Sequence, residues 1–291
     1  MLKADVCVCT RNRPDDLKRC IQSALSSGIA VNSIIVSDDS TDDTTKLFLE
    51  RDFPAIRWIE GPKRGLGANR NRAISAVQGD FIIFLDDDAM LDRDFISVAC
   101  DFGKSHSLDL KNTILTGIEI NNGKEVRSND QNFLGFQRRK YQAGDALNTI
   151  VINSALIPVD IARQIGFDEL LVYGFEEVDF AVRARAENIR IEFCPELRNL
   201  HFPSHINRDF YSPFTDASRI YVTFKRYCLL EKNRFKAGLF WAVASVHLLA
   251  ANVKRLGFRG MGATWKSLRR ANSYKNHFFA RQSDARLRSR S

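Results

Sequence analysis

The sequence predicts an α/β fold with a mostly parallel central sheet, followed by a helical and basic C-terminal extension. Short apolar, β-branched segments alternate with amphipathic segments through the first 85 residues. Strands and helices that alternate with short connections form crossover units, which align the strands in parallel. Polar residues cluster directly after three of the apolar segments. The hydrophobic fraction of 44% is ordinary for a folded chain of 291 residues with a sizeable core.

Local patterns justify the elements of the first half. The apolar run at residues 4–9 is typical of a buried strand, and the segment after Pro14 has one apolar stripe and two acids at its start. Acids at the positive end and a single apolar stripe indicate a surface helix. The expected elements are strands at 4–9, 33–37, 56–59 and 81–85 and helices at 15–26, 44–48 and 68–77.

The second half is less regular. Residues 113–152 indicate mixed strands and loops. Beyond them we expect helices at 159–164 and 177–186, a strand at 190–193 and amphipathic helices from Tyr211 onward. The chain therefore divides into an α/β domain at residues 1–210 and a helical, basic extension at residues 211–291.

Three polar clusters follow predicted strands: Thr10–Arg13, Asp38–Asp42 and Asp86–Asp88. In open parallel sheets, ligands bind at the carboxyl ends of the strands. We expect the three clusters to meet at that edge of the sheet and to form the binding site.

Asp86, Asp87 and Asp88 follow five apolar residues. Adjacent carboxylates at the end of a buried strand repel one another unless a cation lies among them. Carboxylate oxygens suit magnesium or manganese. The residues alone leave open a metal site or an acidic turn that caps a helix.

A glycine-containing loop, Gly65–Gly67, opens the helix that carries Asn69 and Arg70. Glycine loops at helix N-termini favour phosphate, and an arginine can bind it through two hydrogen bonds. A dinucleotide fingerprint is disfavoured, because the third glycine is missing and the preceding strand is the third of the fold.

Three acids, Glu176, Glu177 and Asp179, lie at the start of a predicted helix. They either complement the helix dipole or supply a general base. His201 and His205 follow a strand and are either structural or, beside the carboxylates, able to supply an imidazole ligand to a metal.

In this order the segments resemble the inverting glycosyltransferases of family 2, which have the GT-A fold. The resemblance extends from about Val6 to His205. Its motifs are Val6–Pro14, Val36–Thr44, Asn69-x-Asn71-x-Ala73-Ile74, Gly79–Asp88, Gly166–Glu169 and Gly174–Arg183.

The resemblance implies a role for each matching position. Residues 1–110 would bind the nucleotide and residues 111–210 the acceptor. Asp88 would bind the metal directly, Asp86 the ribose and metal, and His201 the metal or the diphosphate. Glu177 would be the base, with Glu176 or Asp179 as alternatives, because the family more often has Glu-Asp where this chain has Glu176-Glu177. The nucleotide-binding set would be Thr10, Arg11, Arg13, Asp38, Asp39, Gly65, Asn69, Arg70, Asp86 and Asp87.

The implied activity is transfer of a sugar from a nucleotide-sugar, with UDP favoured, to a hydroxyl of a glycan or lipid-linked acceptor in cell-surface polysaccharide synthesis. A divalent metal, manganese or magnesium, would assist it. One alternative is a nucleotidyltransferase, which is disfavoured because Thr10–Pro14 contains no glycine. The other is a non-catalytic membrane-associated scaffold of the same fold.

The basic charge belongs to the C-terminal end. Residues 254–291 carry a net charge of +10, whereas residues 1–253 sum to −2 and the whole chain to +8. Before this end lies an apolar segment, residues 238–253, with basic residues on both sides. Such a helix suits a membrane interface, and the alternative is packing on the protein. Nucleic acid is not expected as a partner, since no recognised binding module is present.

Six scattered cysteines without a CxxC pair are typical of small core residues in a reducing compartment. The first predicted strand begins next to Met1, so no secretory signal is expected. We therefore expect a cytoplasmic protein, peripheral on the inner face of the cytoplasmic membrane. The sequence leaves the oligomeric state open.

Overall fold

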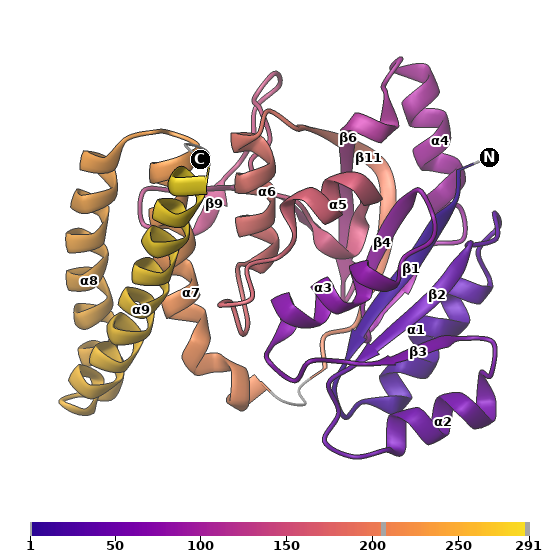
Figure 1. Ribbon diagram of the computed structural model, residues 1–291, viewed down its shortest axis with the longest axis horizontal. Helices are drawn as coiled ribbons and strands as arrows, with labels where there is room; N and C mark the ends of the chain where they lie inside the picture. Colours follow the sequence, from indigo (N-terminus) through magenta and orange to yellow (C-terminus); the bar gives the residue numbers. More distant parts are fainter. Residues whose placement is uncertain (1, 205–207, 289–291) are drawn as a thin grey trace.

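A computed structural model describes residues 2–204 and 208–288, which form a central sheet covered by helices on both faces, with three further helices at one side (Figure 1). The strands of the large sheet are β1 (Ala4–Thr10), β2 (Ser33–Asp38), β3 (Arg57–Glu60), β4 (Phe81–Asp86), β5 (Ala89–Leu91), β6 (Thr113–Asn121), β7 (Lys124–Arg127), β10 (Ala155–Pro158) and β11 (Arg190–His201). The helices are α1 (Pro14–Leu25), α2 (Thr44–Asp52), α3 (Leu66–Ala76), α4 (Phe95–Ser105), α5 (Val159–Ile165), α6 (Glu176–Ala186), α7 (Arg208–Leu229), α8 (Arg234–Leu256) and α9 (Arg259–Arg288). Short elements are the hairpin β8 (Asp130–Gln131) and β9 (Gln137–Arg139), and the 3₁₀ turns η1 (Leu110–Asn112) and η2 (Ile152–Ser154).

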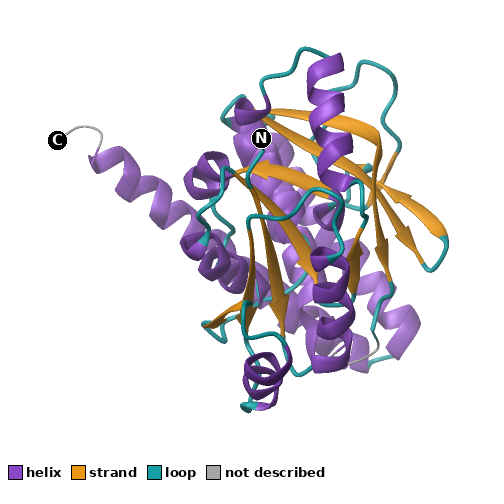
Figure 2. Cartoon of the chain, turned by 90° about the vertical axis from the view of Figure 1, so that its right-hand side faces the viewer, coloured by secondary structure: helices purple, strands orange, loops and turns teal. Residues whose placement is uncertain are grey.

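The nine strands lie in the order β3-β2-β1-β4-β10-β6-β11-β5, with β7 paired to β6. Strands β1, β2, β3 and β4 pair in parallel, as do β6 and β11. Strand β10 is antiparallel to both β4 and β6 and so links the two parallel groups. The predicted α/β fold with a mostly parallel sheet is confirmed, and Figure 2 shows the twist of the sheet.

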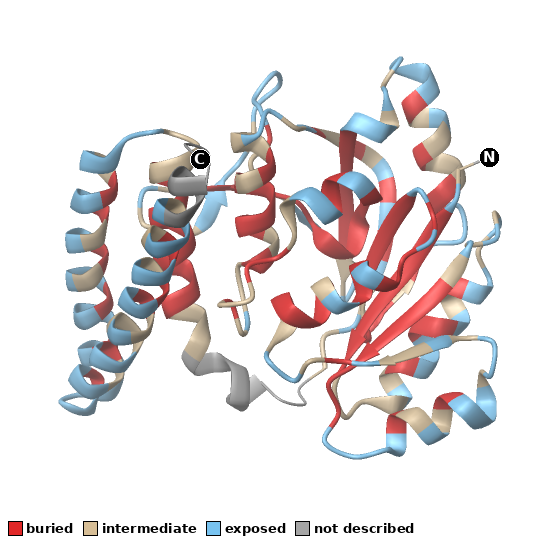
Figure 3. Cartoon of the chain, in the orientation of Figure 1, coloured by how far each residue is buried: buried red, intermediate tan, exposed pale blue. Residues whose placement is uncertain are grey.

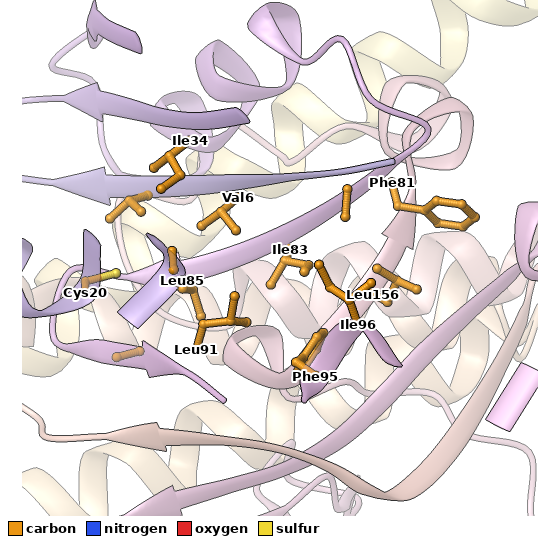
Figure 4. Close-up of a cluster of buried hydrophobic side chains, with 14 of the residues drawn as sticks. Val6, Cys20, Ile34, Phe81, Ile83, Leu85, Leu91, Phe95, Ile96 and Leu156 are labelled. Carbon is orange, nitrogen blue, oxygen red and sulfur yellow. The ribbon is translucent and has the colours of Figure 1, made fainter. Parts of the chain in front are cut away.

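Alternation along the strands divides the core into two halves. Ile83 and Leu85 of β4 pack with α1, α2 and α4, whereas Ile82 and Phe84 pack with α3, α5 and α6 on the other face. Figure 4 shows the first half, where Phe95 of α4 lies beneath the sheet. Because neighbouring residues of a strand point to opposite faces, a strand covered on both sides has to be apolar throughout.

Strand β11 is longer than its predicted span of residues 190–193. It continues past Pro195 to His201, and its register with β6 shifts between Phe193 and Arg198. A bulge of this kind accommodates a proline inside a strand. The extension brings His201 beside Ala89 of β5 and thus to the edge that carries the aspartates. Helix α4 is an element that the sequence did not predict.

The C-terminal helices α7, α8 and α9 share a core with the α/β domain (Figures 1 and 3). Val178 and Val182 of α6 pack with Tyr221 of α7, Phe240 of α8 and Tyr274 of α9. The predicted boundary between residues 210 and 211 falls inside α7, and the division into two domains stays a prediction.

A buried ion-pair cluster joins α7 to the α/β domain. The ammonium of Lys225 lies 2.8 Å from a carboxylate oxygen of Asp168 and 2.6 Å from one of Asp179. Tyr221 donates a hydrogen bond of 2.7 Å to Asp168, and Arg183 lies 2.7 Å from Asp179. Burial alone would raise the pKa of Asp168, but Lys225 and Tyr221 hold it below its ordinary value. The cluster fixes α7 against α6.

We expect the substitution Lys225→Met to destabilise the protein. Removing the cation leaves Asp168 and Asp179 buried with fewer partners, which costs about 3–5 kcal/mol for a broken buried pair. The midpoint of urea unfolding measures the loss. The exposed Lys18→Met is the matched control and should unfold like the wild type. Equal midpoints for the two variants would contradict a role for Lys225 in holding α7.

Candidate functional site

A pocket lies at the carboxyl ends of β1, β2 and β4, where the three polar clusters meet. Among the residues predicted to bind the nucleotide or the metal, those that line it are Thr10, Arg11, Arg13, Asp39, Asn69, Asp86, Asp88 and His201. The topology explains the meeting: β1 pairs with both β2 and β4, so their ends are adjacent. Asp38, Gly65, Arg70 and Asp87 lie around this pocket without lining it.

Asp86, Asp88 and His201 form a cluster whose ligand atoms all lie within 4.8 Å of one another. Two carboxylates and one imidazole fit a manganese or magnesium ion, which prefers oxygen ligands and tolerates a nitrogen. The imidazole Nε2 lies 3.0 Å from Asp88. The donor set therefore suits the predicted cation. His205, also noted in the sequence, lies outside the described residues.

Glu119 and Asn153 hold this cluster, and the sequence prediction missed both. A carboxylate oxygen of Glu119 lies 2.7 Å from Nδ1 of His201, and the side-chain amide of Asn153 donates to Glu119 at 3.0 Å and to Asp86 at 3.2 Å. Asn153 also accepts the backbone N–H of Asp86 at 2.8 Å. The available signal was a lone acid among apolar residues of β6, Ile118-Glu119-Ile120.

The carboxylates around His201 control its protonation. Burial alone would lower the pKa of His201, but hydrogen bonds with Asp88 and Glu119 raise it to about 10. Burial alone would raise the pKa of Asp88. Hydrogen bonds from His201 and from the backbone N–H of Ser204 instead bring this pKa below its ordinary value. A proton thus neutralises part of the negative charge at the place where a divalent cation would bind, and a bound cation would displace it.

Asp87 faces the protein interior. It is fully buried, accepts a 2.7 Å hydrogen bond from the hydroxyl of Thr10 and forms a 2.6 Å ion pair with Arg13. Burial raises the pKa of Asp87 to about 8 against the opposing effect of Arg13. Arg13 also donates to Asp88 at 3.0 Å. Asp87 therefore ties the end of β1 to the end of β4, and Asp86 and Asp88 face the pocket.

The two aspartates at the end of β2 have different surroundings. The carboxylate of Asp38 accepts the N–H groups of Ser40 at 2.9 Å and of the Trp58 indole at 3.1 Å. Asp39 lines the pocket and accepts the backbone N–H of Lys63 at 2.7 Å. Burial raises the pKa of Asp39. Of the two, Asp39 is the one whose side chain can reach a pocket ligand.

The loop before α3 places Asn69 in the pocket. Gly65 has a φ of 109°, and a Cβ at this position would lie 2.5 Å from the Cα of Val172, so only glycine fits. The side chain of Asn69 accepts the hydroxyl of Ser37 at 2.5 Å and donates to its carbonyl at 3.1 Å. These contacts fix the start of α3 against the end of β2.

Arg70 lies inside the protein, between two acids. Its guanidinium donates to Glu176 at 3.0 Å and to Asp86 at 3.1 Å, and its side chain is 2% exposed. The ring of Phe167 lies 5.3 Å from the guanidinium carbon. Arg70 thus connects the metal cluster to the start of α6 and has little surface left for a phosphate.

A second pocket adjoins the first and contains two of the three candidate bases. Its lining includes Glu176 and Glu177, and it shares Asp86, Tyr173 and His201 with the first pocket. Helix α6 starts after Phe175, whose left-handed backbone (φ 67°) turns the chain sharply there. This turn places the two glutamates in the lining of the second pocket.

The three acids of α6 differ in environment. Burial and the neighbouring charge of Glu176 raise the pKa of Glu177 to about 8. Burial also raises the pKa of Glu176, although Arg70 opposes it. Asp179 is fully buried in the cluster with Lys225, outside both pockets. Of the two pocket-lining acids of α6, Glu176 pairs with Arg70, and Glu177 has no ion pair in the described part of the chain.

A family model described as glycosyl transferase family 2 matches residues 5–165. The chondroitin synthase of Escherichia coli is 32% identical over 126 residues, covering 42% of this chain and 18% of that protein. The GalNAc(5)-diNAcBac-PP-undecaprenol beta-1,3-glucosyltransferase of Campylobacter jejuni is 36% identical over 93 residues, 30% of each protein. The match thus spans less than a third of these relatives. S. aureus TarS 1-349 in complex with UDP has a similar fold, with a TM-score of 0.57 at 16% identity over 97% of this chain and 92% of that one.

We expect Glu119→Gln to weaken binding of Mn²⁺. The amide lacks the negative charge with which Glu119 orients His201 and makes its imidazole a stronger ligand. Loss of such supporting contacts typically costs about 10–100-fold in metal affinity. Calorimetric titration of the protein with Mn²⁺ measures the effect, and the exposed Glu187→Gln is the control. Unchanged affinity in Glu119→Gln would show that the carboxylate does not support the site.

Proposed function

We propose that this chain, which belongs to glycosyl transferase family 2, is a glycosyltransferase. It would transfer the sugar of a UDP-sugar to a hydroxyl of a glycan or lipid-linked glycan with inversion. The observation that supports this best is the meeting of two pockets at Asp86, Tyr173 and His201. One pocket carries groups for a nucleotide and a cation, and the other carries an acid suited to be a base. Family membership favours this activity over the nucleotidyltransferase.

The first pocket is proposed as the donor site. Thr10, Arg11 and Asp39 lie at the ends of β1 and β2 and would contact the uracil and ribose. Asp39 takes the place expected for Asp38, because the carboxylate of Asp38 is already hydrogen-bonded to Trp58 and to Ser40. The similarity of the fold to a UDP complex is consistent with this pocket as the nucleotide site.

Asp86, Asp88 and His201 are proposed to hold a divalent cation, manganese or magnesium. The bound ion would neutralise the negative charge of the departing diphosphate. Arg13 forms ion pairs with Asp87 and Asp88, and Arg70 forms one with Asp86. Both arginines would therefore position the carboxylates that bind the metal. This arrangement gives Arg70 a positioning role in place of the expected contact with the diphosphate.

Glu177 is proposed as the general base. It lines the second pocket, and its raised pKa makes it a stronger proton acceptor than an exposed glutamate. In a single displacement the acceptor hydroxyl would give its proton to Glu177 while its oxygen attacks the anomeric carbon, and the bond to the diphosphate breaks. The ion pair of Glu176 with Arg70 and the burial of Asp179 argue against these two alternatives.

We expect Glu177→Gln to lower turnover about 10²–10⁴-fold, the usual contribution of a general base, while the affinity for UDP stays the same. Release of UDP from a panel of UDP-sugars with Mn²⁺ and bacterial glycan acceptors gives turnover, and calorimetry gives UDP affinity. Glu187→Gln, at the exposed end of α6, is the control. A Glu177→Gln enzyme with wild-type turnover would remove this residue from the role of base.

The outer face of α8 supports the proposed contact with a membrane. Residues 237–253 include no Asp, Glu, Lys or Arg. One face of the helix packs on α7 and α9, while the other exposes apolar side chains such as Leu239 (50%), Val246 (69%) and, just beyond, Phe258 (91%). Figure 3 shows this exposed side at the edge of the molecule. Large exposed apolar patches on soluble proteins usually mark an interaction surface.

Helix α8 is long and apolar enough to cross a membrane by length and composition, with 28% of its most apolar window buried. Because α7 and α9 cover its inner side, we propose that it lies in the interface plane. Lys254 and Arg255 lie in its last turn and Arg259 starts α9, and these three would face anionic lipid at about 1 kcal/mol each. The enzyme would then act peripherally at the cytoplasmic face of the membrane, near a lipid-linked acceptor.

We expect the protein to float with vesicles of phosphatidylethanolamine and anionic phosphatidylglycerol. Leu239→Glu with Val246→Glu places two charges on the outer face of α8 and should move most of the protein to the soluble fraction. The control is Leu25→Glu with Leu47→Glu, at exposed leucines elsewhere. Wild-type protein that stays soluble with anionic vesicles would refute the membrane contact.

A further inference from the structure

The second pocket, which contains Glu177, is the proposed acceptor pocket, and a groove continues from it along β7. The acceptor pocket and the groove share Arg127 and Ser128 as lining residues, so a chain bound in one can extend into the other. One wall is the loop at residues 140–147. The opposite wall is formed by Arg185 of α6 and by residues 190–193 at the start of β11.

Polar contacts hold the loop wall in place. The hydroxyl of Tyr141 accepts the N–H of Asn148 at 2.9 Å and lies 3.0 Å from the hydroxyl of Thr149. Thr149 in turn donates to the carbonyl of Asn129 at 3.0 Å. The loop is therefore fastened to the segment that follows β7, which forms the floor of the groove.

The acids of the groove already have partners. Glu125 forms a 2.8 Å ion pair with Arg127, and Glu192 forms a 2.5 Å pair with Arg190. Asp145 accepts the backbone N–H of Gln142 at 3.0 Å. The first two pairs cancel in charge, and the third carboxylate uses one of its oxygens within its own turn.

Two cations of the groove have no acidic partner in the part of the chain that the structure describes. Lys140 is exposed and forms neither an ion pair nor a hydrogen bond there. Arg185 donates from Nη1 to the carbonyl of Ile189 at 3.0 Å, while its Nε is buried without a hydrogen-bond partner. Both groups only donate hydrogen bonds, so together they suit a ligand rich in acceptor oxygens and negative charge.

We propose that this groove is an extension subsite for an acidic glycan acceptor, with Lys140 and Arg185 binding carboxylate or phosphate groups on units behind the reacting one. The proposal rests on the proposed glycosyltransferase function and names the class of its acceptor. It makes the enzyme selective for chains of several units, because a single sugar would fill only the pocket beside Glu177. Lys140 and Arg185 are specificity-determining residues and take no part in the displacement.

The test measures binding of three hexamers to the full chain with Mn²⁺ and UDP at low salt. The probes are unsulfated chondroitin for carboxylates, ribitol phosphate for phosphodiesters and chitohexaose as the neutral control. Because Lys140 and Arg185 would form charge-assisted hydrogen bonds with an acidic chain, we expect at least one acidic hexamer to bind about tenfold more tightly than the neutral one. The acidic hexamer that binds better identifies the source of the negative charge.

Lys140→Gln with Arg185→Gln should weaken binding of that acidic hexamer about tenfold and leave chitohexaose unchanged. Arg93→Gln with Lys104→Gln removes the same charge near α4, away from the groove, and should bind like the wild type. Equal binding of acidic and neutral hexamers, or an unaffected groove variant, overturns the subsite. UDP is titrated with the wild type in the same series. If the wild type does not bind UDP, the proposed function is overturned instead of the subsite.

Discussion

Negative charge concentrated at one buried edge of the sheet is the constraint on which the rest of this structure depends. Six carboxylates lie together there, and Arg13, Arg70 and His201 pair with five of them. The six are Asp86, Asp87, Asp88, Glu119, Glu176 and Glu177. Carboxylates removed from water have to be paired, protonated or bound to a metal. The site uses all three means of compensating the charge. Arg13 and Arg70 form ion pairs, the pKa values of Asp87 and Glu177 are raised, and Asp86, Asp88 and His201 form a ligand cluster that fits a divalent ion.

The same constraint explains the connections between distant elements. Arg13 precedes α1, Arg70 lies on α3 and His201 ends β11, yet each contacts a carboxylate at the end of β4. Because the three cations come from three separate elements, the acidic site is complete only when these elements have packed together. Glu119 of β6 and Asn153 of η2 then orient the ligands from the antiparallel side of the sheet. The pocket is a product of the whole topology, because none of its cations is a sequence neighbour of the acids that it contacts.

Patterns that act over a few residues were readable from the sequence, whereas contacts between elements were not. The apolar strands and the helix stripes of the first half predicted the elements there to within a few residues. The long course of β11 was missed because Pro195 interrupts the strand pattern, and only pairing with β6 and β5 carries the strand to His201. Motifs named Asp86, Asp88 and Glu177, but they could not show that Arg70 is occupied by Glu176, that Asp39 rather than Asp38 faces the pocket, or that Glu119 supports His201.

Helix α6 connects the proposed site to the C-terminal helices, since four consecutive residues of it, about one turn, contact four different parts of the protein. Glu177 lines the second pocket, Val178 packs into the core of α7–α9, Asp179 pairs with Lys225 of α7, and Phe180 packs under the sheet. Contacts on all these sides hold the first turn of the helix in place. A catalytic group has to lie within about 0.5 Å of its productive position to be effective. Because α8 rests on α7 and α9, a surface that holds the outer face of α8 also sets the direction in which the acceptor pocket opens. If Glu177 is the base and α8 binds the membrane as proposed, the C-terminal helices fix the side from which membrane-bound acceptors reach Glu177.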